Sequence, residues 1–477
     1  MTAATLHPSS SAPPTPPDFR PASGATSGSP DGWLRALFVL WTTYGSFYFC
    51  RVNIGPAVPS IRHALGFSAL EIGVVLGTIK LGYAVGQLVN GQLTERFGPR
   101  RILAVGMLGS AVVTLLMACV PVLAGTPAAQ AGGMTTALGR GVWSAGHAVG
   151  LELAPSPALA LMMLFAFANG WFQASGWPAC VKIAGGWFPI QRRGRIMGIL
   201  GTSYTVGSAM AILAVGVLLH AFHAWQIAFV APAAVLALSF VHTALRLREA
   251  PLPPSDGYGA PSPAAPARMA VGDSLRATLG NPRIWVLAFG LFGLDAVRYG
   301  FLDWAPGHLA ELHGSALQAA IKTAVFPLAG ALGTLSSGWL TDRFFQSRRA
   351  PVCALLLVGV GLLTLAYRVV VDVGVLPTVI CLALTGFCLY GAQILLVGTA
   401  AQDFALRGAT AAAAGFVDFT GHMGAFSGDV VTGWMLKRHG WTGAIGWWAC
   451  AAFVAASLVA TLWRARPLDA PPARPRS

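Results

Sequence analysis

Runs of apolar residues, each long enough for an α-helix to cross about 30 Å of hydrocarbon, alternate with short polar connections along almost the whole chain. Roughly twelve such runs can be separated. They are expected to begin at Trp33, Ser68, Ile102, Pro157, Gly194, Trp225, Arg283, Ser315, Pro351, Val375, Thr410 and Trp441. The pattern therefore predicts an all-α polytopic membrane protein with twelve transmembrane helices.

Two stretches rich in Pro, Ser and Ala interrupt this pattern, one at the start of the chain and one after the sixth apolar run. Such segments bury too little apolar surface to fold alone, and they are typical of flexible tails and linkers. The predicted organisation is an N-terminal tail (1–30), a six-helix bundle (31–249), a cytoplasmic linker (250–280), a second six-helix bundle (281–465) and a C-terminal tail (466–477).

The composition supports a membrane protein, because 55% of the 477 residues are hydrophobic and only 10% are charged. The net charge of +14 does not indicate nucleic-acid binding, since most Arg and Lys residues lie in connections on one side of the predicted helices. This asymmetry follows the positive-inside rule and predicts that both chain termini are cytoplasmic in a bacterial-type inner membrane. The expected partners are the lipid bilayer and a small solute.

Arg51 and Arg298 lie inside apolar segments at a separation of 247 residues, and sliding the chain by that interval matches sixteen of 51 positions without a gap. A membrane chain has therefore been duplicated, with one arginine in each half. An arginine near the middle of a bilayer costs several kcal/mol unless it meets a partner or a wet cavity. Two arginines at equivalent positions suggest one shared anion site. The alternative is that the arginines pair with carboxylates inside the protein.

The loop GQLTERFGPRR (Gly91 to Arg101) and its copy GWLTDRFFQSRR (Gly338 to Arg349) resemble the signature loop of the major facilitator superfamily. Small residues allow close helix approach, and the acids could pair with basic groups at a cytoplasmic gate. An ordinary basic loop is the alternative. The candidate gating residues are Gly91, Glu95, Arg96, Arg101, Gly338, Asp342 and Arg343.

Within that superfamily the chain resembles the organophosphate:phosphate antiporters, which include glycerol-3-phosphate and hexose-phosphate transporters. The segments that carry the likeness include YGSFYFCRVNIGPAVP around Arg51, NGWFQASGWPACVKIAGGWFPIQRRG from Asn169, and VRYGFLDWAPGHL around Arg298. The resemblance implies two pseudo-symmetric six-helix bundles, a monomer, and binding of the substrate phosphate by the arginines at positions 51 and 298. Planar, permanently charged guanidinium groups suit the oxygens of a phosphate.

The polar residues of that family's site are only partly retained. Glycerol-phosphate-like members carry a lysine, a histidine, a lysine and a glutamate where this chain has Gln87, Tyr204, Val52 and Pro327. The chain adds charges that the family pattern does not include, namely Lys80, Asp295, Lys322 and Asp418. Lys80 lies two helical turns before Gln87, so it is predicted to replace the missing lysine.

Further candidate ligands lie near the arginines. Tyr44 and Tyr48 share a helical face with Arg51 and either donate hydroxyls to the anion or pack. Asp295 is spaced to pair with Arg298, and Asp303 matches an acid of the family. The cavity is therefore expected to be less positive than in the family, which favours an anion of lower charge or one with a cationic group.

Asp418 and Tyr204 complete the predicted substrate-binding set. Asp418 could contact a substrate amine, carry a proton, or form a hydrogen bond that holds two helices together. Tyr204 occupies the position of the family's histidine.

The predicted function is import of an organic phosphate, either an ester or a phosphonate, by exchange with inorganic phosphate. No P-loop, H-E-x-x-H motif or nucleophile elbow is present, so the chain is not expected to be an enzyme, to use a cofactor or to bind a metal. Two alternatives remain. One is a transporter-like receptor for external sugar phosphate, and the other is a facilitator for another organic anion.

Overall fold

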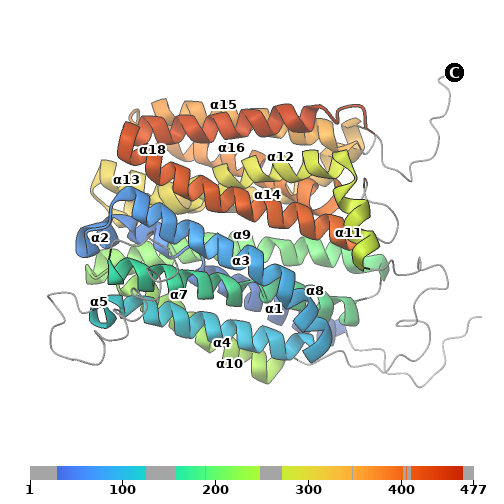
Figure 1. Ribbon diagram of the computed structural model, residues 1–477, viewed down its shortest axis with the longest axis horizontal. Coiled ribbons are helices and arrows are strands. Elements are labelled where there is room, and N and C mark those ends of the chain that lie inside the picture. The colour runs from blue at the N-terminus through green and yellow to red at the C-terminus, as the bar shows by residue number, and fades with distance from the viewer. Residues whose placement is uncertain are drawn as a thin grey trace, which may run out of the picture.

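Long α-helices run side by side along one axis of the molecule (Figure 1). The computed structural model describes residues 30–124, 156–188, 190–247, 271–345, 348–400, 404 and 410–465. The predicted tails and most of the predicted linker lie outside these residues. The helices of the first half are α1 (Pro30–Phe47), η1 (Tyr48–Cys50), α2 (Ile54–Leu65), α3 (Ala69–Phe97), α4 (Pro99–Ala118), α5 (Val120–Leu123), α7 (Pro157–Gln173), α8 (Gly176–Trp187), α9 (Ile190–Phe222) and α10 (Ile227–Arg246).

The second half follows a short helix, α11 (Val271–Leu279), which occupies the end of the segment predicted as a linker. Its helices are α12 (Pro282–Tyr299), η3 (Gly300–Trp304), α13 (Ala305–His313), α14 (Ala316–Phe345), α15 (Arg349–Val370), α16 (Val375–Ile394), η4 (Leu395–Ala400) and α18 (Thr410–Ala460). In Figure 1, α2, α5 and α13 lie at one end of the molecule, and α8 and α11 lie at the other. We call the latter the tail end, because α18 finishes there, and the former the opposite end.

The prediction of twelve transmembrane segments is confirmed. Ten spans among the described residues are long and apolar enough to cross a membrane as single helices. One of them, α18, contains two segments joined at Gly440, where the backbone is not helical (φ 63°). A further segment is split into α1 and α2. Each predicted start lies within four residues of the observed one, because runs of apolar side chains specify membrane helices strongly.

The first segment of each half is irregular next to its arginine. After Arg51 the helix is interrupted, and it resumes at Ile54. Pro56 favours this break, because it has no backbone N–H to donate and its ring would clash with the carbonyl group four residues earlier in a continuous helix. After Arg298 the chain widens into the π-helix η3, just ahead of Pro306. Both arginines therefore extend from points where the regular helix is disturbed near mid-span.

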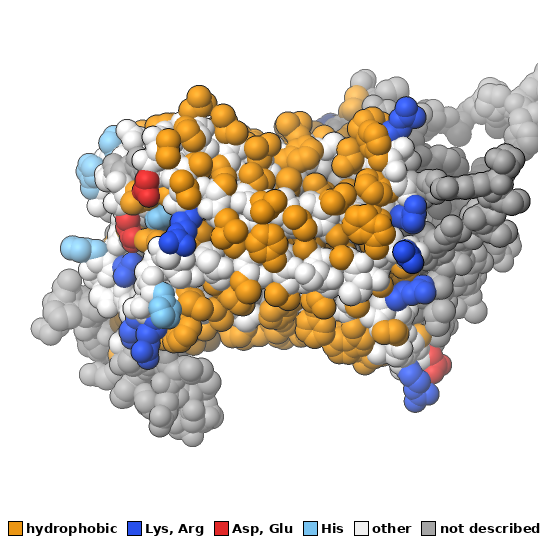
Figure 2. Space-filling model, turned by 90° about the horizontal axis from the view of Figure 1, so that it is seen from above, with side chains coloured by type: hydrophobic (Ala, Val, Ile, Leu, Met, Phe, Trp, Pro, Cys, Tyr) orange, Lys and Arg blue, Asp and Glu red, His pale blue; other side chains and the backbone are white. Residues whose placement is uncertain are grey.

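The outer surface suits a bilayer. Many Leu, Val, Ile and Phe side chains are largely exposed around the helices. Figure 2 shows a broad belt of hydrophobic side chains, with Lys and Arg gathered towards the two ends. A soluble protein rarely exposes so large a continuous apolar surface, so this belt is the lipid-facing perimeter.

The two bundles meet along two antiparallel seams, one between α3 and α18 and the other between α9 and α14. Towards the opposite end these seams are tight. A Cβ atom at Gly73 would stand 2.5 Å from the carbonyl oxygen of Asp429, and one at Gly433 would stand 2.5 Å from that of Ala69. Gly216 packs equally closely on Ala320. Small residues thus allow the two halves to touch backbone to backbone there.

The same seams are open towards the tail end. Gly91 and Gly415 lie eighteen residues, or five helical turns, from Gly73 and Gly433, and therefore on the same helix faces. A Cβ atom at either position would meet nothing within 4 Å. In the seam between α9 and α14, Gly198 and Gly338 lie five turns from Gly216 and Ala320, respectively. These two glycines are equally open. The bundles are closed at the opposite end and apart at the tail end.

A cysteine at Gly415 is therefore expected to react with a membrane-impermeant maleimide applied at the tail end of a chain whose seven native cysteines have been replaced. A cysteine at Ala425, which is 0% exposed on the same helix, is the matched control and should stay unlabelled. Comparable labelling at both positions, or labelling of Gly415→Cys only from the opposite end, would contradict the observed opening.

Candidate functional site

Arg51 lies in the core of the first bundle and has no carboxylate partner among the described residues. Its Nη1 donates to the Tyr48 hydroxyl (3.0 Å), and its Nε donates to Oε1 of Gln173 (3.2 Å). The guanidinium carbon stands 4.5 Å and 4.4 Å from the ring centroids of Tyr48 and Tyr83. Its Nη2 is buried without a hydrogen-bond partner. Part of this cation is thus held by neutral groups and part is left for another acceptor.

Arg298 occupies the equivalent place in the second bundle. Its Nη1 lies 3.5 Å from Oδ1 of Asp295, one turn earlier on α12, which confirms the predicted pair. The guanidinium carbon is 5.0 Å from the ring centroid of Tyr299 and 5.2 Å from that of Tyr390. Its Nε is buried without a hydrogen-bond partner. The alternative in which each arginine pairs with its own carboxylate therefore holds for one arginine only.

A chain of tyrosines connects the two arginines across the bundle interface. The Tyr48 ring beside Arg51 is 5.9 Å from that of Tyr204, and Tyr204 is 5.9 Å from Tyr390 beside Arg298. Tyr44 packs on Tyr48 at 5.8 Å. Of the predicted tyrosines, Tyr48 and Tyr204 thus lie between guanidinium groups contributed by opposite halves, and Tyr44 packs beside them. Their hydroxyls are suited to donate to an anion placed there, as aromatic rings with a polar tip do.

Polar side chains also face each other in the middle of the seam between α3 and α18. The Tyr83 ring stacks on His422 with centroids 4.4 Å apart and an interplanar angle of 18°. One turn nearer the tail end, the Asp418 carboxylate lies beside the side-chain amide of Gln87. His422 Nδ1 lies 2.9 Å from the carbonyl oxygen of Asp418 and must donate to it, because a carbonyl only accepts.

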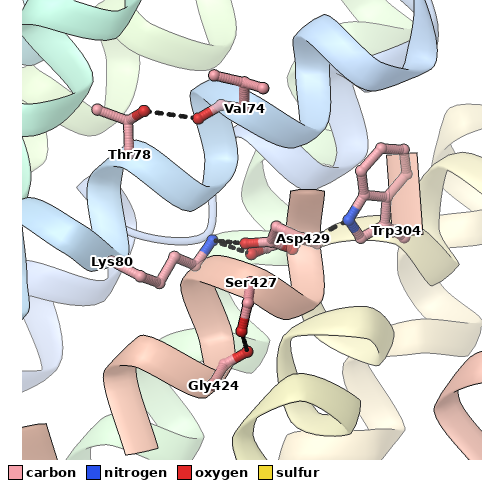
Figure 3. Close-up of polar contacts among 8 residues, drawn as sticks. Val74, Thr78, Lys80, Trp304, Gly424, Ser427 and Asp429 are labelled. Atoms are coloured by element: carbon pink, nitrogen blue, oxygen red, sulfur yellow. Dashed lines mark hydrogen bonds and ion pairs between the residues drawn. The ribbon is translucent and has the colours of Figure 1, made fainter. Parts of the chain in front are cut away.

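Lys80 joins three elements nearer the opposite end (Figure 3). Its Nζ forms ion pairs with Asp303 of η3 and, at 2.9 Å, with Oδ2 of Asp429 on α18. The indole of Trp304 donates to Oδ1 of Asp429 (3.0 Å). None of the three charged residues is more than 3% exposed. We call Lys80, Asp303, Asp429 and Trp304 the buried ion cluster.

The buried ion cluster changes the interpretation of Lys80. The sequence predicts that Lys80 replaces the family's missing lysine as a phosphate ligand, but two carboxylates already take up its charge. Asp303 is held in the same way and does not face an arginine at ion-pair distance. Buried charges of opposite sign pair because each is costly alone. The cluster therefore ties α3 of the first bundle to η3 and α18 of the second.

The sequence alone does not identify several residues of this region as part of the site. They are Tyr83, Gln173, Tyr299, Tyr390, His422 and Asp429. Asp429 had a clear signal, since it is, like Asp418, an acid inside the apolar run that forms α18. The aromatic residues had none, because a tyrosine that faces the site cannot be distinguished by pattern from one that packs.

The predicted gating residues divide into three groups. Gly91 and Gly338 lie on the open parts of the two seams. Arg96, Arg101 and Arg343 are exposed at the tail end. The side chains of Glu95 and Asp342 lie outside the described residues, so the predicted pairing of these acids stays a prediction. Within the described part of the chain there is no group of three His, Cys, Asp or Glu residues that could hold a metal ion.

The fold and the interface site define a multi-pass membrane protein of two six-helix halves with a polar centre. A model of the Major Facilitator Superfamily matches residues 40–428 and, in a second match, residues 307–477. The chain therefore belongs to the Major Facilitator Superfamily.

Curated relatives support the narrower resemblance. The chain is 29% identical to the glycerol-3-phosphate transporter of Bacillus subtilis over 443 residues, covering 90% of this chain and 92% of that protein. It is 24% identical to a probable hexose phosphate transport protein of Chlamydia trachomatis, covering 91% of each. It is 26% identical to the membrane sensor protein UhpC of Escherichia coli, covering 85% of this chain and 86% of that one. These matches confirm the resemblance to the organophosphate:phosphate antiporter family.

Solved structures share the fold. A bacterial homologue of the human lysosomal transporter Spinster, in an inward-facing and unoccupied conformation, aligns with a TM-score of 0.68 at 18% identity. The alignment covers 92% of this chain and 98% of that one. A mutant of the nucleoside transporter NupG aligns with a TM-score of 0.64 at 14% identity, covering 91% of this chain and 98% of that one.

Proposed function

We propose that this protein is a secondary transporter of organic phosphates. The observation that carries the proposal is the convergence of Arg51 and Arg298, from opposite bundles, on one set of tyrosines. Each guanidinium keeps one buried nitrogen without a hydrogen-bond partner. A buried donor left unpaired costs free energy, so an anion that accepts from both would be bound tightly. The glycerol-3-phosphate and hexose phosphate transporters among the relatives support a phosphate-bearing substrate.

Alternating access gives this site a transport mechanism. The bundles are apart at the tail end and closed at the opposite end, so a solute reaches the arginines from the tail end. The positive-inside asymmetry makes that end cytoplasmic. Rocking of the two halves about the arginines would close the seams at Gly91 and Gly338 and open those at Gly73 and Gly216.

Exchange with inorganic phosphate follows from the charge of Arg51. Closing the bundles around an empty site would enclose a guanidinium that has only neutral partners, and an enclosed unpaired charge is costly. A bound anion removes most of this penalty and thereby lowers the barrier to the transition. The carrier is therefore expected to reorient faster when loaded at either end, which is the condition for antiport.

The test is counterflow in proteoliposomes containing the purified full-length chain. Vesicles loaded with inorganic phosphate should take up labelled glycerol-3-phosphate, or a competing phosphate ester or phosphonate, much faster than empty vesicles do. Absence of uptake for every organic phosphate in a broad panel, with correctly inserted protein, would refute the proposal. Equal uptake into empty vesicles would support transport of organic phosphate but refute its exchange for inorganic phosphate.

Two observations favour a receptor function. The relative UhpC is a membrane sensor protein, and its match covers 85% of this chain. The matches to the transporter relatives cover a similar share. The pair between Asp295 and Arg298 also reduces the charge that would drive exchange. A receptor would show saturable binding of a sugar phosphate in a thermal-shift assay without flux in proteoliposomes.

A further inference from the structure

We infer that the preferred substrate is a zwitterionic organic phosphate, whose phosphate lies between Arg51 and Arg298 and whose ammonium group binds the Asp418 carboxylate. This inference rests on the proposed function and specifies its substrate class. The carboxylates around the site, together with the position of Asp418 at the edge of the opening, support it.

The charged groups of the arginine site and of the buried ion cluster, taken together, do not favour a simple phosphate dianion. The two arginines are accompanied by two aspartates, of which Asp295 forms an ion pair and Asp418 does not, and the buried ion cluster contains one lysine and two aspartates. The seven groups therefore carry a formal charge of −1. A phosphate monoester adds about −1.5 to −2 at neutral pH, and like charges repel strongly where water is scarce. A substrate that carries its own cation reduces this repulsion.

Asp418 is the carboxylate among these four that lacks a cationic partner. Asp295 pairs with Arg298, and Asp303 and Asp429 pair with Lys80. The basic group at Asp418 among the described residues is His422, whose Nδ1 lies 3.8 Å from Oδ1, too far for a hydrogen bond. That nitrogen already donates to the Asp418 carbonyl oxygen. The Asp418 carboxylate thus has a neutral neighbour, Gln87, and no counter-ion within the described part of the chain.

The position of Asp418 makes it reachable. Its side chain is 19% exposed, whereas that of Asp295 is 2% exposed. Asp418 lies one turn from Gly415, where the seam between α3 and α18 is open. It is therefore the first acidic group of the site that a solute meets when it enters between the bundles from the tail end.

Contacts between neighbouring side chains place the two proposed subsites in the same region of the seam between α3 and α18. His422 follows Asp418 by one turn and stacks on Tyr83 with ring centroids 4.4 Å apart, and the Tyr83 ring centroid in turn stands 4.4 Å from the Arg51 guanidinium carbon. The anion subsite and the carboxylate subsite are thus joined by two stacked contacts.

The experiment compares two nearly isosteric ligands that differ in one charge. Affinities of 2-aminoethylphosphonate and propylphosphonate are measured by calorimetry on the purified full-length protein, because the first carries an ammonium where the second carries a methyl group. The wild-type chain should bind the aminophosphonate at least about tenfold more tightly, as expected for one charge-assisted hydrogen bond. Asp418→Asn should abolish this preference and leave propylphosphonate binding unchanged or stronger.

Asp372→Asn is the matched control, because Asp372 is exposed at the opposite end, and this variant should retain the wild-type preference. Equal or tighter binding of propylphosphonate by the wild-type chain would overturn the inference while leaving organic phosphate transport intact. An equal loss of both ligands in Asp418→Asn would show that Asp418 supports the fold and would also overturn it. If neither phosphonate, nor glycerol-3-phosphate, nor inorganic phosphate binds, the proposed function itself fails.

Discussion

Replacing Arg51 by alanine should lower uptake of the organic phosphate by more than about 100-fold, because two charge-assisted hydrogen bonds to the phosphate would be lost. Arg298→Ala should have a similar effect, since the duplication places both guanidinium groups around one set of tyrosines. Lysine at either position should restore little, because a single ammonium cannot reproduce the planar pair of donors. Initial rates of counterflow in proteoliposomes measure all four variants.

Arg62→Ala is the matched control for loss of an arginine. Arg62 pairs with Glu311 at 3.3 Å near the opposite end, but its side chain is 32% exposed, and exposed ion pairs contribute little. This variant should retain uptake within about twofold. Wild-type exchange rates in either Arg51→Ala or Arg298→Ala, with normal membrane insertion, would show that the arginine pair does not bind the substrate.

The two arginine variants should differ in stability even though both lose transport. Arg298→Ala removes the partner of Asp295 and leaves a buried carboxylate unpaired, whereas Arg51→Ala exposes no acid in this way. Arg298→Ala should therefore have the lower Tm, and Asp295→Asn in the same chain should restore it without restoring transport. Equal Tm values for the two single variants would show that the pair between Asp295 and Arg298 contributes nothing.

The helices and the arginine pair could be predicted because their signals lie within short stretches of sequence. An apolar run of about 20 residues has few ways to satisfy its backbone in lipid except as a helix. The match between the segments around Arg51 and Arg298 places the two residues at equivalent depths from local sequence alone. The pair between Asp295 and Arg298 was predictable for the same reason, since three residues separate them on one helix.

The partners of Lys80 could not be predicted, because they depend on how α3 crosses helices from the other half. Asp303 is 223 residues away in the chain, and nothing local to either residue indicates the contact. The tyrosines around the site pose the same problem. Tyr83 lies three residues from Lys80 yet stacks on His422, and only the register of the seam between α3 and α18 determines that pairing. The local pattern of a sequence shows which face of a helix a residue lies on, whereas the way two helices cross determines which side chains it contacts.

Lys80→Met should destabilise the protein strongly, because it leaves Asp303 and Asp429 side by side in the core without a cation. Breaking a buried ion pair by removing one partner costs about 3–5 kcal/mol. The Tm of the purified protein should fall by at least about 5 °C. Lys437→Met, which removes an exposed lysine near the opposite end, is the matched control and should leave the Tm unchanged.

Neutralising the whole buried ion cluster should reverse this loss. The triple variant Lys80→Met, Asp303→Asn, Asp429→Asn removes the uncompensated charges along with the lysine, and such replacements are often neutral for stability. It also removes the ion pairs that join α3 to η3 and α18 near the closed end, so a cysteine placed at Ala425 should become more reactive from the opposite end as the bundles separate there. A single Lys80→Met variant as stable as the wild type, or a triple variant with unchanged reactivity at Ala425, would show that the cluster does not hold the opposite end shut.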